Sequence, residues 1–188
     1  DIVSAGPGLS HVVIHLAGVT EYTGDGSGFN GGAAVFGGTL NVNSDLGNSD
    51  VLVHAPTAGF GGGTLGGDGA LGNLYVLGTI APGNSVGTLN VASATFDTGS
   101  LFEVELNDGG FVAGINNDLL NVSGPVIINP GATVHVTPEN GTDDGTTYTP
   151  GTYTIITASG GVTGTFDTLT DDYAFLDFVL DYGTANQI

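Results

Sequence analysis

The 188-residue chain contains no lysine and no arginine, although it carries 19 aspartate and glutamate residues. Its formal net charge at pH 7 is therefore −19 with histidine neutral. Proteins bind phosphate groups mainly through lysine and arginine, so we exclude nucleic acid and the surface of an anionic membrane as direct partners. Because no carboxylate can pair with lysine or arginine, each must be solvated, accept hydrogen bonds or bind a cation.

Cysteine, methionine and tryptophan are also absent. Without cysteine there is no disulfide framework, no thiol chemistry and no cysteine-ligated metal. No apolar run is long enough for a transmembrane helix. Helix-forming residues are scarce, and no stretch carries apolar residues at the i, i+3, i+4, i+7 spacing of an amphipathic helix. The chain is therefore predicted to be all-β.

Glycine accounts for 35 residues, and hydrophobic residues make up 40% of the chain. This composition is not that of a disordered acidic tail, and glycine follows no Gly-x-y period that would indicate collagen. Short runs of alternating apolar residues are separated by corners of Gly, Asn, Pro and Ser. Residues 18–32 are predicted to form a glycine-rich loop. We predict strands at residues 9–16, 33–36, 39–42, 51–54, 64–65, 74–77, 79–80, 86–91, 101–106, 118–122, 126–128 and 133–136.

The sharpest predicted corner consists of Pro82, Gly83, Asn84 and Ser85. Proline fixes φ near −65°, and glycine and asparagine tolerate positive φ, so the chain can turn there and resume as a strand. Such short strands suit a solenoid better than a β-sandwich. Coils of roughly 20–30 residues, each with three strands and three corners, would bury their apolar faces by stacking. We assign residues 1–140 to these coils.

Residues 141–188 differ from the rest of the chain, because a polar insertion precedes a β-branched strand at 152–158 and then most of the late aromatic residues. The open end of a solenoid exposes unpaired backbone and apolar core, and therefore needs a cover. We predict that residues 141–188 form a cap of hairpin-like strands continuous with the coils. Its expected aromatic residues are Tyr153, Phe166, Tyr173, Phe175 and Phe178.

Residues 78–91 (GTIAPGNSVGTLNV) contain a Gly-Thr-Ile strand, the Ala-Pro-Gly-Asn-Ser corner and a Gly-Thr-Leu strand. This pattern closely resembles the passenger-domain repeat of Gram-negative autotransporters, which use type V secretion. Residues 100–106 and 118–124 look like the next coil of that family. Residues 152–167 (TYTIITASGGVTGTFD) resemble its autochaperone region. Residues 9–42 resemble the upstream repeat more loosely.

This resemblance implies a right-handed parallel β-helix at the bacterial cell surface or outside the cell. It also implies an outer-membrane translocator barrel in the same precursor, and a host or matrix surface as ligand. We therefore expect a non-enzymatic structural or adhesive segment. Two alternatives remain open: a subunit of an extracellular filament, sheath or surface layer that self-associates through its solenoid ends, and a calcium-dependent binding module.

Two features of the sequence could point to catalysis. Ser85 stands at the centre of a Gly-x-Ser-x-Gly pattern, but a hydrolase nucleophile of that type is followed by a helix, whereas a strand is predicted here. Glu103 and Glu105 share one face of a predicted strand, yet no lysine or arginine is present to complete a glycosidase-like site. We therefore predict that the chain is not an enzyme, and that Ser85 is a turn residue.

No cofactor is expected, although calcium has candidate ligands. Asp25 and Asp68 lie in predicted glycine-rich loops, and Asp143 and Asp144 are adjacent on another. Calcium binds six to eight oxygen atoms, which carboxylates and loop carbonyls can supply. The alternative is that these carboxylates are solvated and attract only diffuse counterions.

The histidines offer no metal site. His11 and His15 would lie about 13 Å apart on one face of a strand, too far to share a metal ion. We expect this pair to be solvent-facing or hydrogen-bonded, and we find no co-ligands for His54 or His135. Asp118 is expected to accept a hydrogen bond from the backbone of a corner.

Overall fold

The computed structural model describes residues 12–29, 31–140, 146–148 and 150–188. These residues form strands and no helix, so none of them provides a helical membrane span. The strands are β1 Val12–His15, β2 Val19–Tyr22, β3 Gly32–Val35, β4 Gly37–Val42, β5 Asp50–Val53, β6 Gly62–Gly67, β7 Ala70–Val76, β8 Thr79–Pro82, β9 Thr88–Phe96, β10 Leu101–Leu106, β11 Leu119–Val122, β12 Val126–Ile128, β13 Thr133–Pro138, β14 Ile156–Ala158, β15 Val162–Thr163 and β16 Thr168–Asp171.

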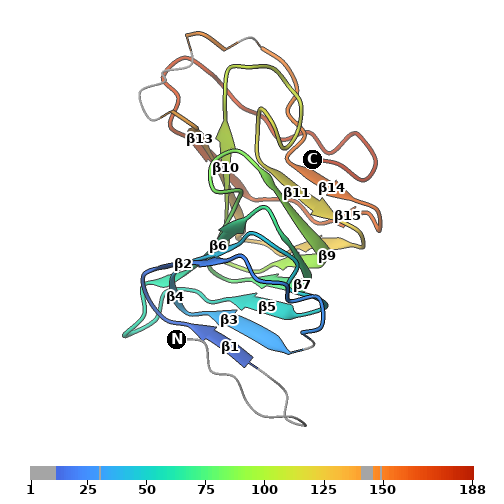
Figure 1. Ribbon diagram of the computed structural model, residues 1–188. Helices are drawn as coiled ribbons and strands as arrows, with labels where there is room; N and C mark the ends of the chain where they lie inside the picture. Colours follow the sequence, from blue (N-terminus) through green and yellow to red (C-terminus); the bar gives the residue numbers. More distant parts are fainter. Residues whose placement is uncertain (1–11, 30, 141–145, 149) are drawn as a thin grey trace.

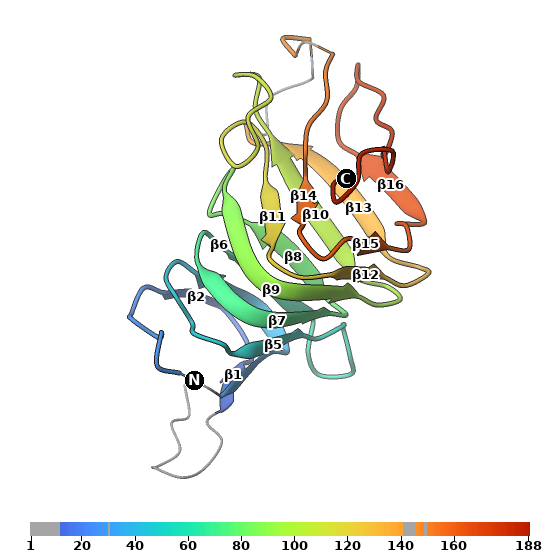
Figure 2. The same cartoon turned by 90° about the vertical axis from the view of Figure 1, so that its right-hand side faces the viewer.

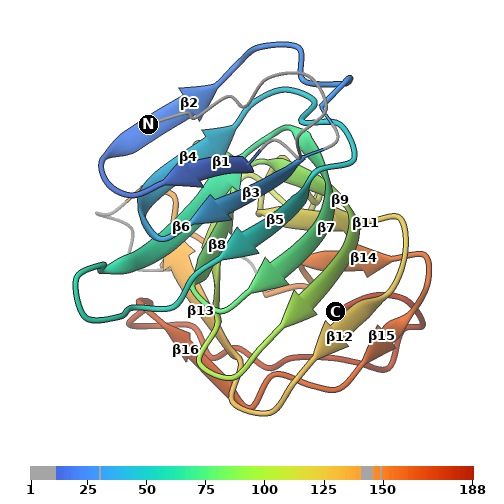
Figure 3. The ribbon, with the colours of Figure 1, turned by 90° about the horizontal axis from the view of Figure 1, so that it is seen from below.

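The strands form two sheets that stack from β1 at one end to β16 at the other (Figure 1). A 9-stranded sheet has the order β1-β3-β5-β7-β9-β11-β14, with β12 and β15 beside it, and a 7-stranded sheet has the order β2-β4-β6-β8-β10-β13-β16. Every pair of neighbouring strands is parallel. The arrows of the two sheets point in opposite directions in Figure 3, because the chain alternates between them. This arrangement confirms the predicted parallel β-solenoid.

The coils differ in detail from the predicted three strands and three corners. Most coils place one strand in each sheet, and only the last coils add a short third strand, β12 or β15. The coils at the C-terminal end are longer than those before them: the bonded side chains of Asn73 and Ser93 lie 20 residues apart, whereas those of Asn121 and Thr157 lie 36 residues apart. The strand β2 lies in the stretch that we predicted as loop, so that prediction was wrong. Its Val-Thr-Glu-Tyr sequence has high β-propensity despite the flanking glycines.

The core consists of apolar residues that face inward from both sheets and stack in rows across the coils. One row of the 7-stranded sheet places each residue over its partner in the next coil, and all its members are at most 5% exposed. This row is Leu40, Leu65, Ile80, Phe102 and Val134. Such stacking removes apolar side chains from water, which no single coil could do alone.

Aromatic residues fill the core near the C-terminal end. The ring of Phe96 lies 5.8 Å from that of Phe102 and 5.1 Å from that of Phe166, measured between centroids. Phe96 and Phe102 come from opposite sheets, whereas Phe166 comes from the segment between β15 and β16. These three rings therefore join the two sheets to the last coil.

The region predicted as a cap of hairpins continues the β-helix before it covers the end. Strands β14, β15 and β16 pair in parallel with β11, β12 and β13, so the last coil extends to Asp171. The final residues pair antiparallel, because Thr157 bridges Gln187 and Ile188 exchanges backbone hydrogen bonds with Ile156. Figure 2 shows this terminal segment lying against the last coil.

Four of the five aromatic residues expected in the cap do pack there. Phe166 and Tyr173 are buried, and Tyr153 and Phe178 pack against the core. Phe175 does not, because 68% of its surface is exposed to solvent. The segment that carries Phe175 forms no strand, so alternation within it does not decide which side chains face the core.

We expect Phe102→Ala to lower the free energy of unfolding by about 3–5 kcal/mol, because it leaves a cavity in the aromatic part of the core. Phe175→Ala is the matched control, and its effect should stay within about 0.5 kcal/mol because Phe175 is exposed. Urea denaturation followed by circular dichroism measures both. Equal losses for the two variants would contradict this description of the core.

Candidate functional site

The corner between β8 and β9 brings together polar side chains from several coils. Gly83 has a φ of 88°, and a Cβ atom at this position would lie 1.9 Å from the carbonyl oxygen of Ser85. Asn84 exchanges side-chain hydrogen bonds of 2.9 and 3.2 Å with Asn43. The hydroxyl of Ser85 donates to Glu139 at 2.7 Å. The corner therefore has a defined conformation and contacts both earlier and later coils.

Two carboxylates accept hydrogen bonds from the backbone where the corner ends. Asp68 accepts one from the N–H of Thr88 at 2.9 Å. Asp118 accepts one from the N–H of Gly87 at 2.9 Å and another from the N–H of Glu105 at 2.8 Å. The predicted role of Asp118 as an acceptor for a corner is thus confirmed, and its carboxylate joins β10 to the start of β9.

A hollow of about 220 Å³ lies beside this corner on the outer face of the 7-stranded sheet. It forms where Gly66 and Ala81, which are paired across β6 and β8, present almost no side chain. Its walls carry Asn41, Asn84, Ser85, Glu103, Glu105 and Asp118. The hollow is therefore polar and acidic, with no basic side chain on its walls.

Burial dominates the electrostatics of this hollow. It raises the pKa of Asp118 to about 8, even though the two N–H donors act in the opposite direction. Burial also raises the pKa of Glu105, and the nearby carboxylates of Glu139 and Glu103 raise it further. Since Asp118 is 1% exposed and has no cationic neighbour, its neutral form is favoured at neutral pH.

Ser85 does not stand in the strand–turn–helix context of a hydrolase nucleophile. It is followed by strand β9 rather than a helix, and its hydroxyl bonds to a glutamate. Among the described histidines, His15 is buried and bonds to the carbonyl oxygen of Gly37, and His54 bonds to the carbonyl oxygen of Ala55. The corner can therefore bind polar groups, and no described histidine is hydrogen-bonded to Ser85.

The candidate calcium ligands do not converge in the part of the chain that the structure describes. Asp25 accepts a hydrogen bond from the N–H of Ser27 at 3.0 Å, and hydrogen bonding to Ser27 lowers the pKa of Asp25. Asp68 is engaged at the corner. Asp143 and Asp144 lie outside the described residues. Within those residues, no three His, Asp or Glu side chains are placed to hold a metal ion, so calcium binding stays a prediction.

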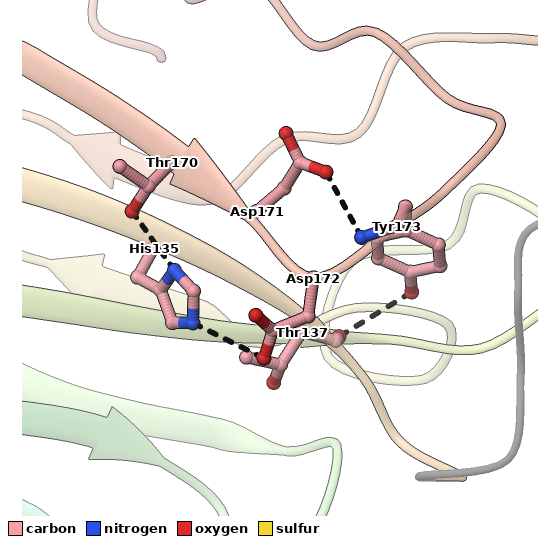
Figure 4. A network of polar contacts seen from close by, with 6 residues as sticks. All are labelled: His135, Thr137, Thr170, Asp171, Asp172 and Tyr173. Carbon is pink, nitrogen blue, oxygen red and sulfur yellow. Dashed lines mark hydrogen bonds and ion pairs between the residues drawn. The ribbon is translucent and has the colours of Figure 1, made fainter.

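A second polar network lies on the outer face at the C-terminal end (Figure 4). Nδ1 of His135 lies 2.9 Å from the hydroxyl of Thr170, and its Nε2 lies 3.4 Å from a carboxylate oxygen of Asp172. Of this network, only His135 was singled out from the sequence. Its partners could not be predicted, because they depend on the register between β13 and β16. A hydroxyl, an imidazole and a carboxylate also form hydrolase triads, and here the three side chains link β13 to β16 and to the residue that follows it. The network therefore fixes the point where the chain leaves β16.

Comparison with known proteins gives one informative similarity. No family profile matches the chain. The chain is similar to an extracellular serine protease of Serratia marcescens, with 35% identity over 125 residues. The match covers 64% of this chain but only 12% of the relative. The matched residues thus span only a small part of this much longer relative, and the similarity does not assign the relative's activity to the chain.

The raised pKa of Asp118 predicts the sign of a pH dependence in the stability of the fold. The pKa is 3.8 in an ordinary environment and about 8 in the fold, so folding favours the protonated form. This stabilisation is complete below the unfolded pKa and is lost as pH rises through the folded pKa. We expect the melting temperature to fall between about pH 5 and pH 8. Asp118→Asn, which cannot ionise, should flatten this slope, whereas the exposed Glu21→Gln should leave it unchanged. An identical slope in Asp118→Asn would contradict the assignment.

The corner itself can be tested with two glycine substitutions. Gly83 and Gly99 both have positive φ, but only a Cβ at Gly83 would meet other atoms within 4 Å. We expect Gly83→Ala to lower the free energy of unfolding by at least about 1 kcal/mol more than Gly99→Ala, because a steric clash is added to the same backbone strain. Urea denaturation measures the free energy of unfolding of both variants. Equal losses would contradict this prediction, because they would show that the corner accommodates the added Cβ without extra cost.

Proposed function

We infer that this chain is a non-enzymatic, structural β-helical segment of an extracellular bacterial protein, of the kind displayed as an autotransporter passenger. It acts as a rigid spacer that carries its neighbours away from the cell. Its outer surface is available for contacts with a host or matrix surface.

The observation that carries this proposal is the continuous stack of parallel coils. The core rows run through both sheets, and side-chain bonds such as Asn90–Asn121 and Asn121–Thr157 link successive coils on the outer face. The similarity to a small part of an extracellular protease supports an extracellular location. The corner-and-strand pattern of residues 78–91 supports the passenger type.

Display outside the cell can be tested by inserting an epitope between Ala58 and Gly59, in the exposed loop between β5 and β6 of the natural precursor. We expect antibody to bind intact cells of the producing bacterium, with no increase after permeabilisation. A periplasmic marker that stays inaccessible controls for cell integrity. Binding that appears only after permeabilisation would contradict surface display.

The non-enzymatic role is tested separately on the purified chain. We expect no hydrolysis of casein and no labelling by a fluorophosphonate, because no described histidine bonds to Ser85. Ser85→Ala provides the matched control for labelling. A label on wild-type chain that is lost in Ser85→Ala would overturn the structural assignment and support a hydrolase.

A further inference from the structure

The C-terminal end of the β-helix contains a cavity of about 500 Å³ between the last coils and the terminal segment. Its floor is apolar and continues the core rows of the stack. The floor consists of Val104, Leu106, Val136, Ile155, Leu169 and Ile188. Phe178, Tyr153 and the 88% exposed Val179 also line it. The end of the core is therefore only partly covered.

The two sheets end differently beside this cavity. In the 9-stranded sheet, the edge of β14 is paired with the final residues through Thr157 and Ile156. In the 7-stranded sheet, β16 pairs with β13 alone, and no backbone hydrogen bond from its outer edge to any other described residue is found. A free edge next to an apolar cavity can accept a further strand.

The residue that faces inward at this edge restricts which strand can bind. Val104 pairs with Val136, and Val136 pairs with Asp171, so Asp171 occupies the row that holds valine in the preceding coils. Its carboxylate accepts the N–H of Tyr173 at 2.9 Å (Figure 4). A charged residue that points inward at an edge disfavours the addition of an apolar or acidic strand. Asp177 and Asp181 line the same cavity and strengthen this preference.

We propose that the free edge of β16 binds an extended peptide of another protein, in which an apolar residue is followed two positions later by lysine or arginine. The peptide adds as a strand parallel to β16, with its apolar side chain over Leu169 and its basic side chain over Asp171. The positions between them face outward, over Thr168 and Thr170, where cross-strand threonine pairs are favourable.

Charge complementarity identifies a foreign peptide rather than a second copy as the occupant. The chain has no lysine or arginine, so a second copy cannot neutralise Asp171. Each copy also carries a formal net charge of −19, and the two would repel one another. A peptide that carries a basic residue gains both the backbone ladder and the ion pair.

The test uses the complete chain and a fluorescein-labelled peptide, Gly-Ser-Thr-Leu-Thr-Lys-Ser-Gly, in fluorescence polarisation at physiological salt. Two control peptides have Asp in place of Lys, or have Leu and Lys exchanged. We expect the first peptide to bind at least about tenfold more tightly than either control. Equal binding of the exchanged peptide would show unspecific attraction to an acidic protein and overturn the proposal.

Variants of the chain test the same site from the other side. Asp171→Asn should weaken binding of the lysine peptide by about tenfold. Glu21→Gln removes one charge at the far end of the stack and should have no effect. Thermal melts establish whether both variants are folded. If Asp171→Asn unfolds, the charge swap takes its place as the test, and Asp171→Lys should bind the aspartate peptide. No loss in a folded Asp171→Asn would contradict the assignment.

Backbone pairing is tested with N-methylated peptides. In a strand that adds to one edge, alternate N–H groups point toward that edge and the others point away. Methylation of one alternate set should abolish binding, and methylation of the other should leave it intact. Equal effects of both sets would exclude strand addition. Sedimentation should show a monomer, and concentration-dependent association would instead identify a second copy as the occupant.

Discussion

The main hydrogen-bond partners of the carboxylates in this chain are backbone N–H groups. In most proteins, lysine and arginine share this role. An aspartate at a corner accepts a hydrogen bond from the N–H of a residue one or two positions later in the chain, or from the N–H of a residue in another coil. The local bonds are Asp25–Ser27, Asp45–Gly47, Asp97–Thr98, Asp171–Tyr173 and Asp181–Gly183. The bonds between coils include Asp68–Thr88, Asp118–Gly87 and Asp167–Gly131. A β-helix suits this composition, because its many corners supply N–H donors that no strand uses.

The same constraint explains why carboxylates differ so much in their surroundings. Asp25 is exposed and its local bonds with Ser27 favour the charged form, which lowers its pKa. Asp118 has comparable bonds but is buried, and the desolvation of its charge outweighs them. A protein with basic side chains could offset this desolvation with an ion pair. Here burial favours the neutral acid, so we expect the stability of the corner between β8 and β9 to depend on pH.

Much of the fold could be predicted from local sequence, because short strands with one buried face alternate clearly. The strand β10 was predicted with its observed bounds, since apolar and acidic residues alternate strictly in Leu-Phe-Glu-Val-Glu-Leu. By contrast, β2 was missed between glycines, and residues predicted as hairpins proved to be a further parallel coil. Parallel strands buried on both faces read as continuous apolar runs, but β14 buries only one face and alternates like an antiparallel strand, so its sequence could not distinguish the two.

The candidate sites were harder to predict because they join distant residues. Asp118 lies 31 positions from Gly87, and Ser85 lies 54 positions from Glu139. These separations depend on the lengths of the intervening corners, which vary from coil to coil. The sequence could assign a type of partner to Asp118, a corner N–H, but not the particular residue. Likewise, nothing local reveals that Asp171 continues a row of valines, because that follows from the register of β13 and β16.

The aromatic residues of the core are distributed unevenly along the stack. The first coils bury small side chains such as Ala33 and Val35, whereas the last coils bury Phe96, Phe102 and Phe166. In a stack where each coil contacts only its neighbours, stability is close to a sum of local terms. On this basis, the coils that bury the phenylalanines contribute more to stability than the first coils. We therefore expect heating to open the N-terminal coils before the coils that contain the three phenylalanines.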